Sequence, residues 1–316
     1  MPGRFEWGPF KCNVGSLDRP ERKLPNNGTS DLALQNGQAS VIDRERNNGR
    51  NTRSHLWQIA RVLRWQPDCI PIRERRLEMN AGEGLSQRTA VSIPADNVVL
   101  QGDLALPPAP KGVVLFAHGS GSSRHSPRNR YVADVLNQHS LGTLLADLLT
   151  ADEEREDQFT AQRRFDIGLL TRRLVGIMDW LGSPESPTQG HGFELGLFGA
   201  STGAAAALLA AAERPDLVKA VVSRGGRPDL AGRGISLVRA PTLLIVGGKD
   251  TAVLQMNREA KELIPCKSEL KIVRGASHLF EEPGALKEVA QVAADWFGAY
   301  LAEQGESKGI YPLGAL

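Results

Sequence analysis

The sequence predicts an α/β domain in residues 86–305, with a mostly parallel central sheet flanked by helices. Short apolar runs alternate with segments of helical periodicity along this part of the chain, which is the pattern of an α/β fold. Several of these runs are apolar at every position, as strands buried on both faces of a parallel sheet are. In such sheets ligands bind at the carboxyl ends of the strands, so the residues that follow each run are the candidates for chemistry.

The regular pattern begins with residues 89–107, which alternate in polarity and turn at 95–97, as a β-hairpin does. Further strands are predicted at 112–119, 141–149, 193–200, 218–226, 241–250 and 268–278. Helices are predicted at 126–142, 163–182, 202–216 and 285–304. About 17 residues separate the strands near 223 and 241. This leaves no room for a lid domain, so we expect an open site for small substrates.

Residues 1–85 differ from the rest and are predicted to be a disordered, basic N-terminal extension. Residues 1–80 hold 14 Lys and Arg against 9 Asp and Glu. A nucleic-acid-binding arm is an alternative, but a solvated tail is favoured and a nucleic-acid partner is not expected. A further hypothesis makes Met79 the natural start of the protein. Residues 306–316 are predicted to be a C-terminal tail.

Composition indicates a cytoplasmic protein with no membrane association. The chain has 316 residues, 41% of them hydrophobic, and a net charge of +2. No run approaches the roughly 18 apolar residues of a membrane span, and Arg4, Glu6 and Lys11 occupy the place of a signal peptide's apolar core. The cysteines are Cys12, Cys69 and Cys266. Their spacing indicates neither a disulfide framework nor a metal site, so we expect no metal and no cofactor; the oligomeric state stays open.

Ser201 is the candidate nucleophile. It stands in Gly199-Ala200-Ser201-Thr202-Gly203, a G-x-S-x-G pattern between a predicted strand and a predicted helix. A nucleophile on so tight a turn needs small neighbours, because larger side chains would clash with the strand and the helix. The alternative is a small-residue turn that only packs the helix close to the strand.

Asp250 and His278 follow two later predicted strands and complete the candidate site. Serine is a weak nucleophile at neutral pH, so it needs a base to take its proton and a carboxylate to orient that base. Asp250 could instead cap a helix, and His278 could be an ordinary loop residue. His118 and His125 are competing bases and Asp147 is a rival acid. These three precede Ser201 in the chain, which favours structural roles for His118 and Asp147.

The backbone N–H groups of Ser120 and Thr202 are the expected donors to the oxyanion of acyl transfer. Thr202 follows the nucleophile directly, and Ser120 lies in the loop after the strand at 112–117. Arg124 and Arg224 also fall near strand ends, as do Arg128 and Arg227. If two of these arginines point inward, the substrate carries a carboxylate; otherwise they tie loops to nearby carboxylates.

With these parts assembled, residues 88–304 resemble the α/β-hydrolase superfamily, in which the nucleophile, acid and base follow in this order. The segments "HGSGSSRHSPRNRYVADVLN" (118–137), "ADLLT" (146–150) and "VVSRGGRPDLAG" (221–232) are similar to its dienelactone-hydrolase-like group. Some members of that group are fused to a phosphoribosyltransferase domain, which nothing in residues 1–85 resembles. Dienelactone hydrolases proper use a cysteine, where this chain has Ser201.

The resemblance implies hydrolysis of an ester-like bond through an acyl-enzyme, and the serine favours a carboxylesterase over a dienelactone hydrolase. Two alternatives stay open. One is acyl transfer to an acceptor other than water, including peracid formation, on the same residues. The other is a non-catalytic binding protein with this fold.

Overall fold

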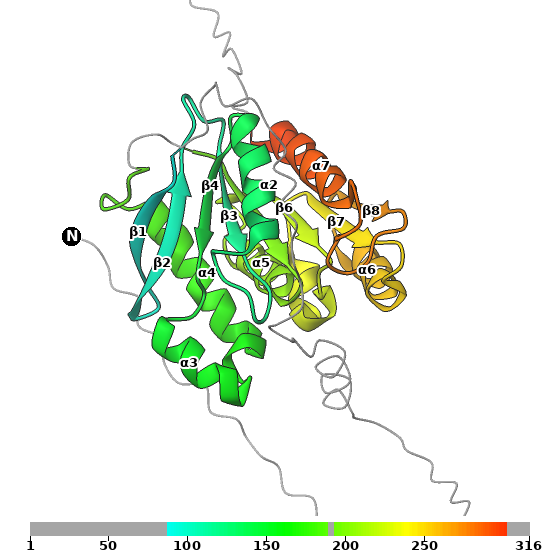
Figure 1. Ribbon diagram of the computed structural model, residues 1–316, viewed down its shortest axis with the longest axis horizontal. Helices are drawn as coiled ribbons and strands as arrows, with labels where there is room; N and C mark the ends of the chain where they lie inside the picture. The colour runs from blue at the N-terminus through cyan, green and yellow to red at the C-terminus, as the bar shows by residue number, and fades with distance from the viewer. Residues whose placement is uncertain (1–86, 189–192, 302–316) are drawn as a thin grey trace, which may run out of the picture. The chain divides into compact units, whose positions relative to one another are not determined.

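The computed structural model describes residues 87–188 and 193–301. Its centre is an eight-stranded sheet with the strand order β1-β2-β4-β3-β5-β6-β7-β8 (Figure 1). The strands are β1 (Thr89–Ala95), β2 (Val98–Ala105), β3 (Val113–Ala117), β4 (Gly142–Ala146), β5 (Leu195–Ala200), β6 (Val218–Arg224), β7 (Thr242–Gly247) and β8 (Ser268–Val273). The helices are α2 (Pro127–Gln138), α3 (Ala151–Thr160), α4 (Ile167–Leu181), α5 (Thr202–Glu213), α6 (Thr251–Leu263) and α7 (Ala285–Tyr300). The 3-10 segments are η1 (Arg163–Phe165) and η2 (Pro228–Leu237). The predictions for 1–85 and 306–316 lie outside the described residues.

The predicted hairpin is confirmed and forms one edge of the sheet. Ala95 pairs with Val98 across a two-residue turn. Asp96 and Asn97 have φ values of 47° and 62°, as the favoured two-residue hairpin turn requires. β2 then pairs antiparallel with β4, and the strands from β3 to β8 are parallel. The carboxyl ends of these parallel strands therefore share one edge of the sheet.

The continuously apolar runs are strands covered on both faces, as predicted. Every residue of β3 is buried. Val114 and Phe116 pack in one hydrophobic cluster with residues of α2 and α7. Leu115 and Ala117 pack in a second cluster with residues of α4 and α5. Figure 1 shows α2 and α7 together on one side of the sheet. Since both faces are buried, alternation in polarity is absent from the sequence of such a strand.

Helix α3, like α6, has no counterpart among the helices predicted from periodicity. Its sequence is ADEEREDQFT, and Asp157 is its only buried residue. It begins with a capping box, in which the Thr150 side chain accepts from the Glu153 N–H and Glu153 accepts from the Thr150 N–H. Local capping and a neighbouring 3-10 turn hold this helix, so an analysis that relies on an apolar stripe does not find it.

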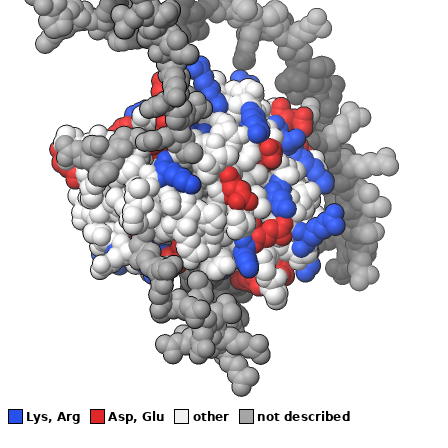
Figure 2. All heavy atoms as spheres, turned by 90° about the horizontal axis from the view of Figure 1, so that it is seen from above, with Lys and Arg blue, Asp and Glu red and all other residues white. Residues whose placement is uncertain are grey.

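None of the described helices is long and apolar enough to cross a membrane. On the face drawn in Figure 2, Lys and Arg side chains are interspersed with Asp and Glu side chains. The described residues also form ion pairs, such as that of Lys271 and Glu288, whose charged atoms are 2.8 Å apart.

Candidate active site

Ser201 lies on the turn between β5 and α5, at the carboxyl edge of the parallel strands. Its backbone has φ 51° and ψ −120°, in a region that costs a non-glycine residue on the order of 1–3 kcal/mol. Such strain persists only where the surrounding structure imposes it, and it is concentrated at functional sites. The half-buried side chain therefore stands in the geometry that a strand-to-helix nucleophile turn requires.

The two glycines that flank Ser201 are required by close packing. A Cβ atom at Gly199 would lie 2.4 Å from the Cα of Ala204, and one at Gly203 would lie 2.3 Å from the carbonyl oxygen of Ala117. Both obstacles are backbone atoms, which cannot move aside as the end of a side chain can. The small neighbours expected from the sequence are thus a steric necessity of this turn.

Asp250 and His278 contact each other directly. Asp250 precedes α6 at the N-cap position, yet its side chain makes no capping hydrogen bond. Its Oδ2 instead accepts from His278 Nδ1 at 2.6 Å. The carboxylate that could have capped a helix is used to orient an imidazole, which leaves Nε2 of His278 as the nitrogen for proton transfer.

The loop after β6 connects this pair to the nucleophile turn. The Ser201 N–H donates to the Arg224 carbonyl at 3.2 Å. A Cβ at the next residue, Gly225, would lie 3.5 Å from both Nδ1 and Cε1 of His278. The imidazole thus packs beside the strand end that adjoins Ser201. Among the residues that the structure describes, no hydrogen bond joins the Ser201 hydroxyl to His278.

Glu282, which the sequence analysis does not single out, holds the His278 loop. Its two carboxylate oxygens each accept from the Ser277 N–H at 3.0 Å, and Oε1 lies 3.8 Å from Nζ of Lys249. Ser277 precedes His278 and Lys249 precedes Asp250, so one carboxylate joins the two loops. The Ser277 N–H is the main cause of a lowered pKa for Glu282. Because its partner is a backbone group, no spacing rule could have identified it.

We expect Glu282→Gln to destabilise the protein at neutral pH and to lower kcat by up to about tenfold, because small displacements of catalytic groups are costly. The folded-state pKa of Glu282 is lowered, so its stabilisation is present above the unfolded pKa and is lost as pH falls through the folded pKa. Urea midpoints of the variant and wild type should therefore differ at pH 7 and converge in acid. Glu281→Gln, at the exposed neighbour, is the control; equal effects of both changes would contradict the assignment.

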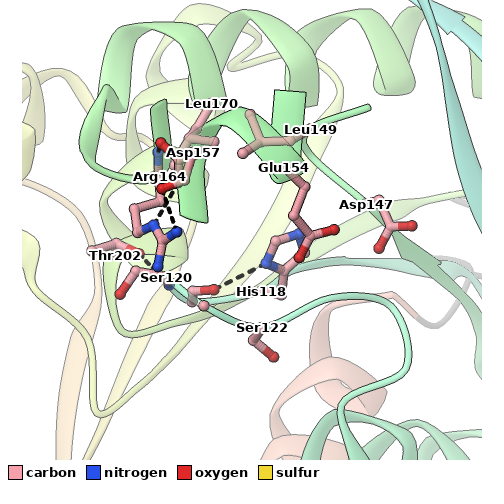
Figure 3. Close-up of a pocket in the computed structure, with 12 residues that line it drawn as sticks. His118, Ser120, Ser122, Asp147, Leu149, Glu154, Asp157, Arg164, Leu170 and Thr202 are labelled. Carbon is pink, nitrogen blue, oxygen red and sulfur yellow. Dashed lines mark hydrogen bonds and ion pairs between the residues drawn. The ribbon is translucent and has the colours of Figure 1, made fainter. Parts of the chain in front are cut away.

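The Ser120 N–H, expected to be a free oxyanion donor, already has an acceptor. It donates to Oγ1 of Thr202 at 2.9 Å (Figure 3). Thr202 is the first residue of α5 and is only 3% exposed. The loop is packed closely on the nucleophile turn, since a Cβ at Gly119 would lie 3.1 Å from the Ser201 Cβ. The structure brings the two predicted donor residues together, with the Thr202 side chain accepting the hydrogen bond of the Ser120 amide.

A pocket opens beside these groups, below α3 and α4 (Figure 3). The empty space along it, counted together with open solvent, is about 430 Å³. His118 lines it but has no free nitrogen: Nδ1 is 3.0 Å from the Gly119 carbonyl, and Nε2 accepts from the Leu148 N–H at 3.2 Å. Burial lowers the pKa of His118. A neutral ring with both nitrogens bound to backbone shapes the loop and is not available as a base.

The two other competing residues, Asp147 and His125, each contact an arginine. Arg124 forms an ion pair with Asp147, and its Nε lies 3.5 Å from Oδ1 of Asp103. The Arg124 N–H donates to Asp147 at 2.7 Å as well. His125 is exposed and contacts Arg130 at 2.7 Å. Asp147 is therefore committed to Arg124, and both groups hold the loop after β3.

Arg224 differs from Arg124 because it is buried without an anion. It is 8% exposed, and Nη2 donates to Oδ1 of Asn129 at 3.3 Å. Its guanidinium lies 5.9 Å from the centroid of the Phe280 ring. Burial and the charge of Arg128 lower the pKa of Arg224 to about 10. Within residues 87–188 and 193–301, no carboxylate forms an ion pair with Arg224. Arg227, by contrast, is paired with Asp229.

In the described part of the chain, no cluster of three or more His, Cys, Asp or Glu could hold a metal ion.

No family model matches the chain, but it is similar to several known proteins. The solved structure of a dienelactone hydrolase from Anabaena variabilis has 56% sequence identity and a TM-score of 0.66, covering 69% of this chain and 99% of that chain. Est1E from Butyrivibrio proteoclasticus, solved with ferulic acid, has 17% identity and a TM-score of 0.57 over 68% of this chain and all of its own, a likeness of fold alone.

Two Mycobacterium tuberculosis proteins named as phosphoribosyl transferases are 52% identical over 217 residues. This match covers 69% of the present chain and 47% of each relative. The chain thus spans about half the length of the curated relatives it matches.

Proposed function

The chain belongs to the dienelactone-hydrolase-like group of the α/β-hydrolase superfamily, and on that premise we propose that it is a serine hydrolase of carboxylic ester-like bonds. The observation that carries the proposal is the hydrogen bond of 2.6 Å between Asp250 and His278, made by a carboxylate that leaves its helix uncapped. The strained backbone of Ser201 beside it supports the same conclusion.

In the proposed mechanism, Ser201 Oγ attacks the acyl carbon while His278 Nε2 takes its proton. Asp250 keeps the other proton on Nδ1 and stabilises the imidazolium that forms. His278 then gives its proton to the leaving alcohol, and the acyl-serine remains. Water, deprotonated by His278 in turn, attacks the acyl carbon and frees the acid and Ser201. The helix dipole of α5, whose N-terminus adjoins Ser201, favours the negative charge of both tetrahedral intermediates.

The serine is the reason for proposing a carboxylesterase and not a dienelactone hydrolase. Two of the fold neighbours are named as esterases: the esterase domain of a Rhodothermus marinus protein at 20% identity and a Pyrococcus furiosus esterase at 16% identity. The phosphoribosyl transferase name of the Mycobacterium tuberculosis relatives is not carried over, because this chain matches less than half of each of them.

A fluorophosphonate probe tests the nucleophile. We expect the full-length protein to gain one adduct, located by mass spectrometry on the peptide that contains Ser201, and Ser201→Ala to gain none. Ser122→Ala, at a half-buried serine of the neighbouring loop, should label as the wild type does. Absence of labelling in folded wild-type protein would contradict the proposal and favour a binding protein with this fold.

The environment of Arg224 supports the proposal that the substrate carries a carboxylate near its scissile bond. Burying a guanidinium without a counter-ion has a large desolvation cost. Arg224 also lies next to the nucleophile, since its carbonyl accepts a hydrogen bond from the Ser201 N–H. An anionic group of the substrate would supply the missing partner. Arg124, which the sequence analysis placed with Arg224, forms ion pairs with Asp147 and Asp103, so the proposal keeps Arg224 alone.

We expect Arg224→Met to raise KM for a 4-nitrophenyl hemisuccinate by about 10- to 100-fold, the range for hydrogen bonds to a charged group. KM for the neutral 4-nitrophenyl butyrate should stay within about twofold of the wild-type value. The neutral ester is thus the control within one variant. An equal change for both esters would mean that Arg224 only supports the Phe280 segment.

A further inference from the structure

The side-chain hydroxyl of Thr202 occupies the place where an oxyanion donor was expected. Its Oγ1 accepts the Ser120 N–H at 2.9 Å, and Figure 3 shows the two residues together at one end of the pocket. A hydroxyl that accepts one hydrogen bond still has a hydrogen to donate. Among the described residues, the Thr202 hydroxyl has no acceptor for that hydrogen. A buried O–H without an acceptor, one residue after the nucleophile, calls for a ligand atom.

The loop that carries Ser120 is held in place on both sides, so this contact is not easily broken by loop movement. On one side, Gly119 packs so tightly that a Cβ would lie 3.1 Å from Ala200 O and from Ser201 Cβ. On the other, the His118 ring bridges Gly119 and Leu148 through backbone hydrogen bonds. The Ser120 N–H is thereby directed at Thr202.

Thr202 itself has little freedom to turn away. It is 3% exposed, and a β-branched side chain in a helix has few favourable χ1 rotamers. A hydroxyl that accepts a hydrogen bond is also polarised into a better donor, because hydrogen bonds in a chain strengthen one another. The hydrogen bond from the Ser120 N–H therefore makes the Thr202 hydroxyl a stronger donor to a ligand atom.

We propose that Thr202 is a catalytic residue whose O–H, polarised by the Ser120 N–H, donates to the oxyanion of the tetrahedral intermediate. The oxyanion then receives two hydrogen bonds from Thr202, one from its backbone N–H and one from its hydroxyl, and Ser120 acts through the hydroxyl. The inference rests on the proposed function, since it needs an acyl intermediate on Ser201. It differs from the expectation of two backbone amides in making the side chain at 202 essential.

Thr202→Val and Thr202→Ser distinguish this donor role from an alternative in which the hydroxyl only covers the Ser120 N–H. Valine keeps the shape of threonine and removes only the hydroxyl, whereas serine keeps the hydroxyl. We expect Thr202→Val to lower kcat for 4-nitrophenyl acetate by about 10²- to 10³-fold, the loss typical of one oxyanion donor, with KM within about twofold. Thr202→Ser should keep kcat within about fivefold. If the hydroxyl were a gate that merely covers Ser120, valine would free the amide, and an unchanged or higher kcat would overturn the proposal.

A transition-state analogue gives a readout that a structural role would not move. A trifluoromethyl ketone forms a tetrahedral adduct with an oxyanion, so its inhibition constant should rise in Thr202→Val by about the factor by which kcat/KM falls. A rise in KM for substrate without weaker inhibition by the ketone would overturn the proposal. Thr202→Ala, which removes the hydroxyl with less bulk, repeats the test if valine lowers the thermal midpoint.

Wild type and Ser201→Ala, assayed in parallel, keep the two proposals distinguishable. Wild-type protein that neither hydrolyses the ester nor labels at Ser201 would overturn the proposed function and this inference with it. Wild-type activity that depends on Ser201 but survives Thr202→Val would overturn this inference alone.

Discussion

Replacing Ser201 by alanine is expected to lower kcat for ester hydrolysis by about 10⁶-fold, as the loss of the nucleophile does in other serine triads. The Ser201 side chain projects from a backbone with φ 51°. No neighbouring hydroxyl could therefore take the position of the Ser201 hydroxyl. KM for a neutral ester should change little, because the hydroxyl contributes mainly to the transition state. The measurement is a steady-state assay with 4-nitrophenyl acetate, with the buffer rate subtracted.

The change at Ser201 needs a control for stability as well as for specificity. Alanine tolerates positive φ as poorly as serine does, so the thermal midpoint should stay close to that of wild type. Ser122→Ala should keep kcat within about twofold, since Ser122 lines the pocket without a proposed role in bond making. A kcat for Ser201→Ala within tenfold of wild type would rule out a serine mechanism at this residue.

Asp250→Asn is expected to lower kcat by about 10⁴-fold, the loss measured for the corresponding change in a serine protease triad. The carboxylate accepts from His278 Nδ1 at 2.6 Å. It thereby keeps the proton on Nδ1, leaving Nε2 free to take the proton of Ser201. An asparagine amide can instead donate to Nδ1, which moves the ring proton to Nε2 and removes the base. Stability should change less than activity, because the Asp250 side chain does not cap α6.

Asp147→Asn is the matched control, because Asp147 is the rival acid at another strand end. It is paired with Arg124, so its replacement should weaken the loop after β3 and lower the thermal midpoint. The loss in kcat should remain far below that of Asp250→Asn. The reverse order of effects on kcat would assign the acid to Asp147.

The strands and most helices could be predicted because each has a local signature. The apolar run of β3 is buried on both faces, and the Asp-Asn turn of the first hairpin has the positive φ values that its residues favour. α3 could not be found in this way. Its helix depends on the capping box of Thr150 and Glu153, and its one buried residue is a charged Asp157, so periodicity indicates nothing there.

For the site, the sequence alone indicated which residues stand at strand ends: Ser201 and Asp250 follow apolar runs that form buried strands, and His278 follows β8, of which only Val273 is buried. Chain order and strand periodicity are local properties, and a parallel sheet brings such ends to one edge. Which partner each side chain takes was decided by the tertiary structure. It alone pairs Asp147 with Arg124 and leaves Arg224 without an anion. It alone sets the Thr202 hydroxyl on the Ser120 amide and joins two loops through Glu282. Some of these contacts link side chains from separate loops, and others link a side chain to a backbone group, which every residue type has. Neither kind of contact produces a recognisable spacing in the sequence.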